Sequence, residues 1–99
     1  MFGMHYIYWR KKIMIILRNR RNQPEFNGVW VATSTSHHKS LQKDVPELGP
    51  FFLAGNERRG NWLLIQGDTD GFEQAAIRVC ELISHGDPRI GNLTEKAPL

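Results

Sequence analysis

The chain has 99 residues, of which 40% are hydrophobic and 23% charged, and its net charge is +3. This length suits one domain, and the hydrophobic content is sufficient for a core, which excludes an intrinsically disordered chain. The longest purely apolar run has five residues, from Ile13 to Leu17, whereas a membrane-spanning helix needs about 20. Because Cys80 is the only cysteine, no intramolecular disulfide can form. We therefore expect a cytoplasmic protein without a transmembrane segment.

The positive charge is concentrated at the start of the chain. Six basic residues and no acidic residue precede Glu25, whereas the rest of the chain, with seven basic and ten acidic residues, has a net charge of −3. Clustered cations beside aromatic side chains favour an anionic partner, because cations release counterions from phosphate and aromatic rings stack on bases. We interpret residues 1–12 as a basic aromatic arm that can be mobile, residues 13–88 as a single domain, and residues 89–99 as a C-terminal tail.

Two strands are expected in the first third of the chain. Residues 12–18 form a short apolar run that is rich in β-branched side chains and bounded by charges, which is typical of a strand buried on both faces. Residues 18–27 are polar and end in Asn27-Gly28, a dipeptide that favours a turn. In the following strand, residues 29–33, the odd-numbered side chains share one face and the even-numbered side chains the other.

A short helix is predicted next, and a hairpin follows it. Residues 33–40 are rich in helix N-capping side chains, and Pro46 requires the helix to end at or before Val45. Residues 51–54 and 62–66 are apolar runs on either side of a glycine-flanked loop, which is the pattern of a β-hairpin.

The final helix has the clearest pattern. Its apolar residues recur at spacings of three and four and form one stripe. The stripe consists of Phe72, Ala75, Ala76, Val79, Leu82 and Ile83. Asp70 is placed to cap the start of this helix and Gly86 to end it, while Cys80, at the margin of the stripe, is expected to pack.

These elements predict an α+β fold. The expected architecture is a two-layer sandwich, in which a mixed or antiparallel sheet of about four strands carries two helices. The order along the chain is strand, strand, helix, strand, strand, helix. If both helices cover one face, the other face would remain open with Trp30 or Trp62 on it, and such a face would be a dimer or ligand surface.

Arginines in two loops are the first candidates for an anion-binding site. Arg18, Arg20 and Arg21 follow the first predicted strand, and Arg58 and Arg59 lie at the tip of the predicted hairpin. Guanidinium groups bind phosphates through paired hydrogen bonds, although a solvated loop without a ligand is the alternative interpretation. Because Met4 and Met14 are also candidate initiators, the anion prediction depends on Arg18, Arg20 and Arg21 more than on residues 1–13.

The turn at residues 33–40 is the second candidate. It combines hydroxyl groups, backbone N–H groups at a helix start and a cation, which together can hold a phosphate. Its side chains are Ser34, Thr35, Ser36, His37, His38 and Lys39. The turn lacks the glycines of a Walker A loop or a dinucleotide-binding fingerprint, and here too a solvated turn is the alternative.

We interpret the chain as a small non-enzymatic binding module for nucleic acid or another polyanion. One alternative is a phosphate-ligand-binding protein, or a small enzyme, that uses the second candidate turn with His37 or His38 as acid or base. Another is a homodimer formed through the open face of the sheet. We predict no catalytic residues and no cofactor. We also predict no metal site, because adjacent helical histidines diverge by about 100° and lack a ligand partner at helical spacing.

Overall fold

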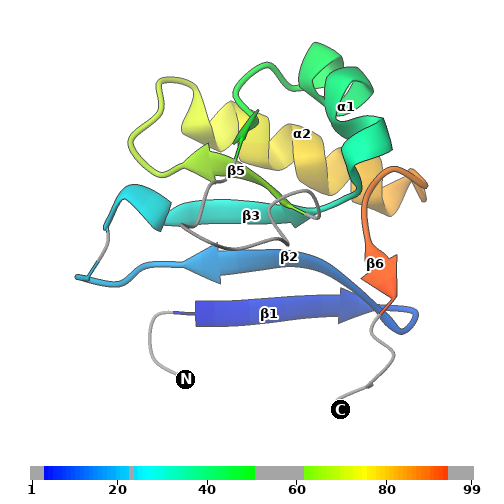
Figure 1. Cartoon of the computed structure of the whole chain (residues 1–99), viewed down its shortest axis with the longest axis horizontal. Helices are drawn as coiled ribbons and strands as arrows, with labels where there is room; N and C mark the ends of the chain where they lie inside the picture. Colours follow the sequence, from blue (N-terminus) through cyan, green and yellow to red (C-terminus); the bar gives the residue numbers. More distant parts are fainter. Residues whose placement is uncertain (1–3, 23, 51–61, 94–99) are drawn as a thin grey trace.

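The structure is a computed structural model that describes residues 4–22, 24–50 and 62–93. Within these residues, antiparallel strands form one sheet in the order β1-β2-β3-β5-β4, and β6 also pairs with β2 (Figure 1). The strands are Met4–Trp9 (β1), Lys12–Arg18 (β2), Gly28–Ala32 (β3), Gly49–Pro50 (β4), Trp62–Gln66 (β5) and Asn92–Leu93 (β6). The α-helices are His38–Asp44 (α1) and Phe72–Ser84 (α2), and Pro24–Phe26 and Thr35–His37 form single 3-10 turns.

The predicted α+β class is confirmed. Both helices pack on the same face of the antiparallel sheet, and β2, β3, α1, β4, β5 and α2 follow one another in the predicted order. Met4–Trp9 and Asn92–Leu93 were not expected to be strands, but the structure places both beside β2. The strand predicted at 51–54 lies outside the described residues, although β4 just before it is antiparallel to β5.

The main core lies between the sheet and the two helices, and it confirms the local patterns. Val29 and Val31 of β3 face this core, whereas Trp30 and Ala32 lie on the opposite face. All six residues of the predicted stripe on α2 belong to the core or pack against it. In α1, Leu41 and the following Val45 are almost completely buried.

A β-bulge divides the consecutive apolar residues of β2 between the two faces of the sheet. Ile7 pairs with Ile15 and Tyr8 pairs with Ile13, so Met14 is the extra residue on β2. Met14 and Ile15 both lie in the helix-side core, whereas Ile13 lies in the cluster on the opposite face. The bulge therefore places Met14 toward the helices, where it can line a space between β2 and α2.

The face opposite the helices carries a second, smaller cluster. It consists of Ile13, Ile16 and Ala32, with Met4, Trp30 and Trp62 packed against them. The rings of Trp30 and Trp62 meet edge to face with centroids 6.0 Å apart, and Trp30 Nε1 donates a hydrogen bond to the backbone oxygen of Phe26. Both tryptophans thus lie on the predicted face, where they are partly buried.

The start of α2 corrects the predicted helix cap. Gly71, with φ of 79°, is the N-cap residue, and the N–H of Phe72 donates to the carbonyl of Thr69. The N-cap makes no side-chain capping hydrogen bond, so Asp70 does not cap the helix. The reason is the turn over residues 69–72, which moves the helix start one residue beyond Asp70.

The end of α2 matches the prediction. Gly86 has φ of 75°, and the N–H groups of Gly86 and Asp87 donate to the carbonyls of Ile83 and Leu82, which is a Schellman motif. Cys80 is exposed, contrary to the expectation that it packs. It follows the buried Val79 by about 100° around the helix, which turns it toward solvent.

After α2 the chain returns to the sheet and is held there by backbone contacts. The N–H of Gly91 donates to the carbonyl of Ala32, and Thr33 Oγ1 donates to the carbonyl of Arg89. Gly91 has φ of 112°, and a Cβ on it would lie 2.8 Å from the sulfur of Met14. The positive φ favours glycine here, and the close approach brings this segment beside β2.

Candidate functional site

The loop between β2 and β3 uses its first arginine internally. Arg18 is only 7% exposed, and its guanidinium donates to Asn27 Oδ1 (2.9 Å) and to the backbone oxygen of Asn22 (2.8 Å). The Asn27 amide also bonds the backbone N–H and carbonyl of Arg20. Arg20 is half-buried and Arg21 is exposed. Arg18 therefore holds the loop together, and anion binding by this loop stays a prediction that Arg21 is best placed to serve.

Ser34 makes two side-chain contacts within the turn before α1. Ser34 Oγ lies 3.1 Å from Ser36 Oγ and 3.3 Å from His37 Nδ1. Thr35, Ser36 and Lys39 are exposed, whereas His37 and His38 are half-buried. Phosphate binding there stays a prediction. Arg58 and Arg59, the remaining arginines of the first candidate group, lie outside the described residues.

The turn between β1 and β2 has an unusual composition for its geometry. Trp9 pairs with Lys12, and the two residues between them, Arg10 and Lys11, have φ of 54° and 66°. Two-residue hairpin turns with positive φ at both positions strongly prefer Asn-Gly, because other L residues lose about 1–2 kcal/mol each in this conformation. Two cations therefore occupy strained positions at the tip of the first hairpin.

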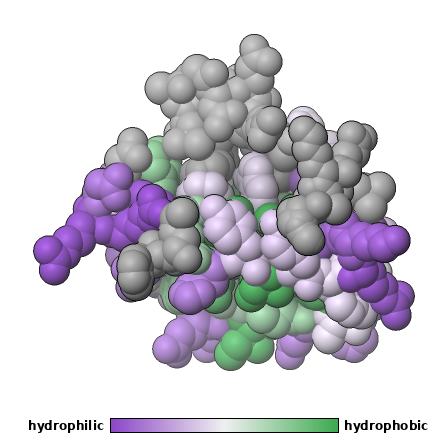
Figure 2. Space-filling view, turned by 90° about the horizontal axis from the view of Figure 1, so that it is seen from below, coloured by the Kyte–Doolittle hydropathy of each residue, from purple (hydrophilic) through white to green (hydrophobic). Residues whose placement is uncertain are grey.

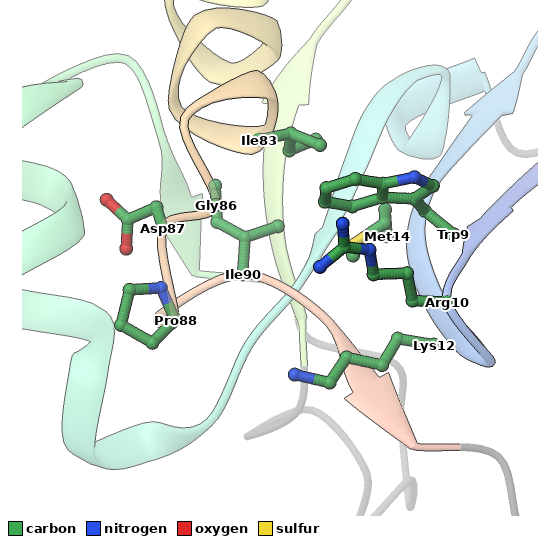
Figure 3. Close-up of a pocket in the computed structure, with 9 residues that line it drawn as sticks. All are labelled: Trp9, Arg10, Lys12, Met14, Ile83, Gly86, Asp87, Pro88 and Ile90. Atoms are coloured by element: carbon green, nitrogen blue, oxygen red, sulfur yellow. The ribbon is translucent and has the colours of Figure 1, made fainter.

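A cavity of about 180 Å³ opens beside this turn (Figure 3). The hairpin provides one wall through Trp9, Arg10, Lys12 and the bulge residue Met14. Ile83 at the end of α2 provides the other, together with Gly86, Asp87, Pro88 and Ile90. Met14 and Ile90 are buried in the main core, so the floor of the cavity is apolar.

Two cations lie at the rim of this cavity. The guanidinium carbon of Arg10 is 4.5 Å from the centre of the Trp9 ring, which is a cation–π contact. A guanidinium that stacks by its face keeps the N–H donors in its plane available for an anion. Lys12 is on the same side of the cavity (Figure 3). No carboxylate among the described residues forms an ion pair with Arg10 or Lys12.

The acid in the cavity wall is already neutralised. Arg89 binds Asp87 at 2.6 Å and Asp44, at the end of α1, at 2.8 Å. The hydrogen bond from Arg89 lowers the pKa of Asp87, and the hydrogen bonds to both carboxylates raise the pKa of Arg89. In Figure 3 the Asp87 carboxylate points away from Trp9 and Arg10. The cavity therefore retains a positive rim.

Strand β1 exposes large side chains next to the cavity. Tyr6, Ile7, Tyr8 and Trp9 are 40–46% exposed, and the strand contains no Asp, Glu, Lys or Arg. Seen from the β1 side, green and pale atoms gather in the middle of the surface, with purple atoms on both sides (Figure 2). Among the described residues β1 pairs with β2 alone, so it forms one edge of the sheet. Long uncharged edge strands are association-prone.

The structure joins parts of the sequence that no motif connects. The basic aromatic start was recognised from its charge, but Ile83 was assigned only to the helix stripe and Ile90 to a tail. Ile90 is the one large apolar residue in the first part of that tail, and this isolated apolar side chain could have indicated that the segment packs on the core. For Met14 there was no signal, because a bulge in a run of similar residues leaves the sequence pattern unchanged.

The described residues contain no helix long and apolar enough to cross a membrane. They also contain no group of three His, Cys, Asp or Glu residues that could hold a metal ion. No protein-family model matches the chain, and no curated protein or solved structure shows a significant match to it.

Proposed function

We propose that this protein is a non-enzymatic, cytoplasmic binding module that contacts an anionic partner through the β1–β2 hairpin. The observation that carries the proposal is the turn at Arg10 and Lys11, where two cations occupy conformations that favour asparagine and glycine. Backbone strain of this kind occurs preferentially at functional sites. Neither cation forms an ion pair with a described residue, so both are available to a partner.

Single-stranded nucleic acid is the partner that this surface fits best. Tyr6 and Tyr8 pair with Ile16 and Ile13 across β1 and β2, so both rings lie on the face away from the helices. Exposed aromatic rings beside a cationic turn are the combination that binds single strands, because the rings stack on bases while the cations follow the phosphates. The exposed Arg21 is a further candidate contact.

The test is the salt dependence of binding to a fluorescently labelled single-stranded oligonucleotide. The triple variant Arg10→Gln, Lys11→Gln, Lys12→Gln should bind more weakly, and its slope of log K against log salt should be less steep by about 2, at roughly 0.7 per phosphate contact. The matched control, Lys39→Gln, Lys43→Gln, Arg78→Gln, removes three exposed helical cations and should leave most of the affinity. Equal losses in both variants, or no binding by the unmodified protein, would refute the proposal.

Substitution of a tyrosine tests the stacking part separately. Tyr8→Ala should weaken oligonucleotide binding by about 5- to 150-fold, which corresponds to about 1–3 kcal/mol per stacked base. Ile77→Ala, which truncates an exposed apolar side chain on α2, is the control and should have no effect. Unchanged binding by Tyr8→Ala would exclude stacking of a base on this ring.

A homodimer is the second candidate, and the edge of β1 is the observation that favours it. Antiparallel pairing of two β1 strands about Ile7 would place Tyr6 of one copy opposite Tyr8 of the other and keep the cationic turns at opposite ends. This contact differs from the open sheet face expected from the sequence. A mass near twice 11.4 kDa in solution, reduced to the monomer by Ile7→Lys, would support it. A monomer across micromolar concentrations would exclude it.

A further inference from the structure

We infer that the cavity between the β1–β2 turn and the end of α2 binds a ligand with one apolar ring and one carboxylate. This inference rests on the proposed function, because the same hairpin provides one wall. It adds a class of ligand and a defined site. The site is separate from the tyrosines, which lie on the other face of the sheet.

The size and floor of the cavity fit a single ring. Its volume of about 180 Å³ compares with the engineered apolar cavities of about 150 Å³ that accept benzene. Met14 and Ile90 form a floor that is continuous with the main core, and Ile83 and the Trp9 ring flank it. An apolar ring that binds here would be transferred from water to an environment of sulfur, methyl and aromatic groups, and this transfer favours binding.

The rim fits a carboxylate at the edge of that ring. Trp9 and Lys12 are a cross-strand pair, so their side chains leave the hairpin on the same face, toward the end of α2. The stacked Arg10 is restrained by Trp9 before any ligand arrives, which reduces the entropy lost on binding. A guanidinium with free in-plane donors binds a carboxylate through two parallel hydrogen bonds.

The remaining charges also favour an anion over a cation. Asp87 is the one acid among the described residues that line the cavity, and Arg89 already holds it. A cationic ligand would have to compete with Arg89 for the Asp87 carboxylate, whereas an anionic ligand leaves that ion pair intact. Lys11 belongs to the same turn but does not line the cavity, which provides a matched control for charge.

The primary experiment is a titration of the full-length ¹⁵N-labelled protein with phenylacetate, followed by NMR. Phenylacetate should cause saturable shifts of the Trp9 indole Nε1–H signal and of the Gly86 and Ile90 amide signals. Phenylacetamide, which has the same shape without the charge, should bind at least about tenfold more weakly, because hydrogen bonds to charged groups are the stronger ones. Equal binding of the two compounds, or no saturable shift at these signals, would overturn the inference.

A second arm separates two sources of the same chemistry. An N-acetylated Gly-Gly-Phe peptide with a free carboxylate presents the ring and the charge as the end of a chain, and its C-terminal amide is the control. Tighter binding of the peptide acid than of phenylacetate identifies a chain end as the ligand. Tighter binding of phenylacetate identifies a free small molecule.

Three variants test the site and separate it from the proposed function. Arg10→Gln should remove the preference for acid over amide, and Ile83→Phe should fill the cavity and abolish phenylacetate binding without changing oligonucleotide binding. Lys11→Gln should weaken oligonucleotide binding and leave phenylacetate binding unchanged. If Lys11→Gln weakens phenylacetate binding as much as Arg10→Gln, the cavity is not the site. The dispersion of each variant's amide spectrum reports whether that variant folds. If Ile83→Phe does not fold, the comparison of Arg10→Gln with Lys11→Gln, both at exposed positions, still tests the site.

Discussion

The loop after β2 and the turn before β2 both contain basic side chains, but these side chains differ in what they contact. In the loop, Arg18 is buried and donates to Asn27 and to the backbone of Asn22, so its charge stabilises the chain itself. In the turn, Arg10 and Lys11 form no ion pair with a described residue and occupy strained conformations. The difference teaches that the availability of a local acceptor, more than the number of charges, decides whether a cation is left for a partner.

The largest expected effect is on the loop. Arg18→Gln should lower the free energy of unfolding by about 2–3 kcal/mol, because hydrogen bonds to charged groups contribute about 1.5–3 kcal/mol and glutamine cannot reach both acceptors. Urea denaturation measures this loss. Arg21→Gln, at an exposed position in the same loop, should change stability by less than about 0.5 kcal/mol. If Arg18→Gln left stability unchanged and reduced oligonucleotide binding, the contrast between a structural Arg18 and a partner-binding turn would be wrong.

A smaller effect of opposite sign is expected at the turn. The double variant Arg10→Asn, Lys11→Gly should raise the free energy of unfolding by about 1–2 kcal/mol, because these residues adopt positive φ with less strain. In a domain of this size that gain raises Tm by about 4–8 °C per kcal/mol. Oligonucleotide affinity should fall at the same time.

The control for the turn keeps the strain and removes the charge. Arg10→Gln, Lys11→Gln should lose oligonucleotide affinity without any gain in Tm. If the asparagine–glycine variant is stabilised and still binds as tightly as the unmodified protein, the strained turn has no connection with binding.

The smallest effect concerns the acid that Arg89 holds. Because the pKa of Asp87 in the folded protein is below its usual value of 3.8, the pair stabilises the fold above about pH 3.8 and loses this contribution as pH falls through the lowered pKa. Asp87→Asn should therefore be less stable than the unmodified protein by about 1 kcal/mol at neutral pH. The difference should shrink toward pH 3, as measured by urea denaturation at several pH values.

An exposed acid provides the control for this pH dependence. Asp68→Asn, in the turn before α2, should show a smaller difference at neutral pH. A difference between Asp87→Asn and the unmodified protein that stays constant down to pH 3 would contradict the role of the charged pair.

The elements that could be predicted are those whose pattern is local. The stripe on α2, the alternation in β3 and the Gly86 terminus each depend on residues a few positions apart, and each is confirmed. The first strand was missed because Met4–Trp9 lacks alternation of polar and apolar residues and its turn lacks glycine and asparagine. The cap at Asp70 was wrong because the N-cap is Gly71, one residue later.

The candidate site was harder to predict because it depends on contacts between distant residues. In the sequence Arg18 resembles any other loop cation. Only the fold brings it to Asn27, nine positions further on, which accepts its hydrogen bond. The cavity combines Trp9 and Met14 with Ile83 and Ile90, and only the return of the chain after α2 brings these residues together. The charge of the first segment could be recognised from the sequence, but the apolar floor beside it could not.

The pairing of β6 with β2 has a consequence for how the protein is made. Lys12 leaves the ribosome well before its partner Leu93 is made. Contacts of such long sequence separation form late and slow the folding of a chain. The hairpin therefore leaves the ribosome before the cavity wall formed by Gly86, Asp87, Pro88 and Ile90, so a ligand would meet a nascent chain whose hairpin is present before its site exists.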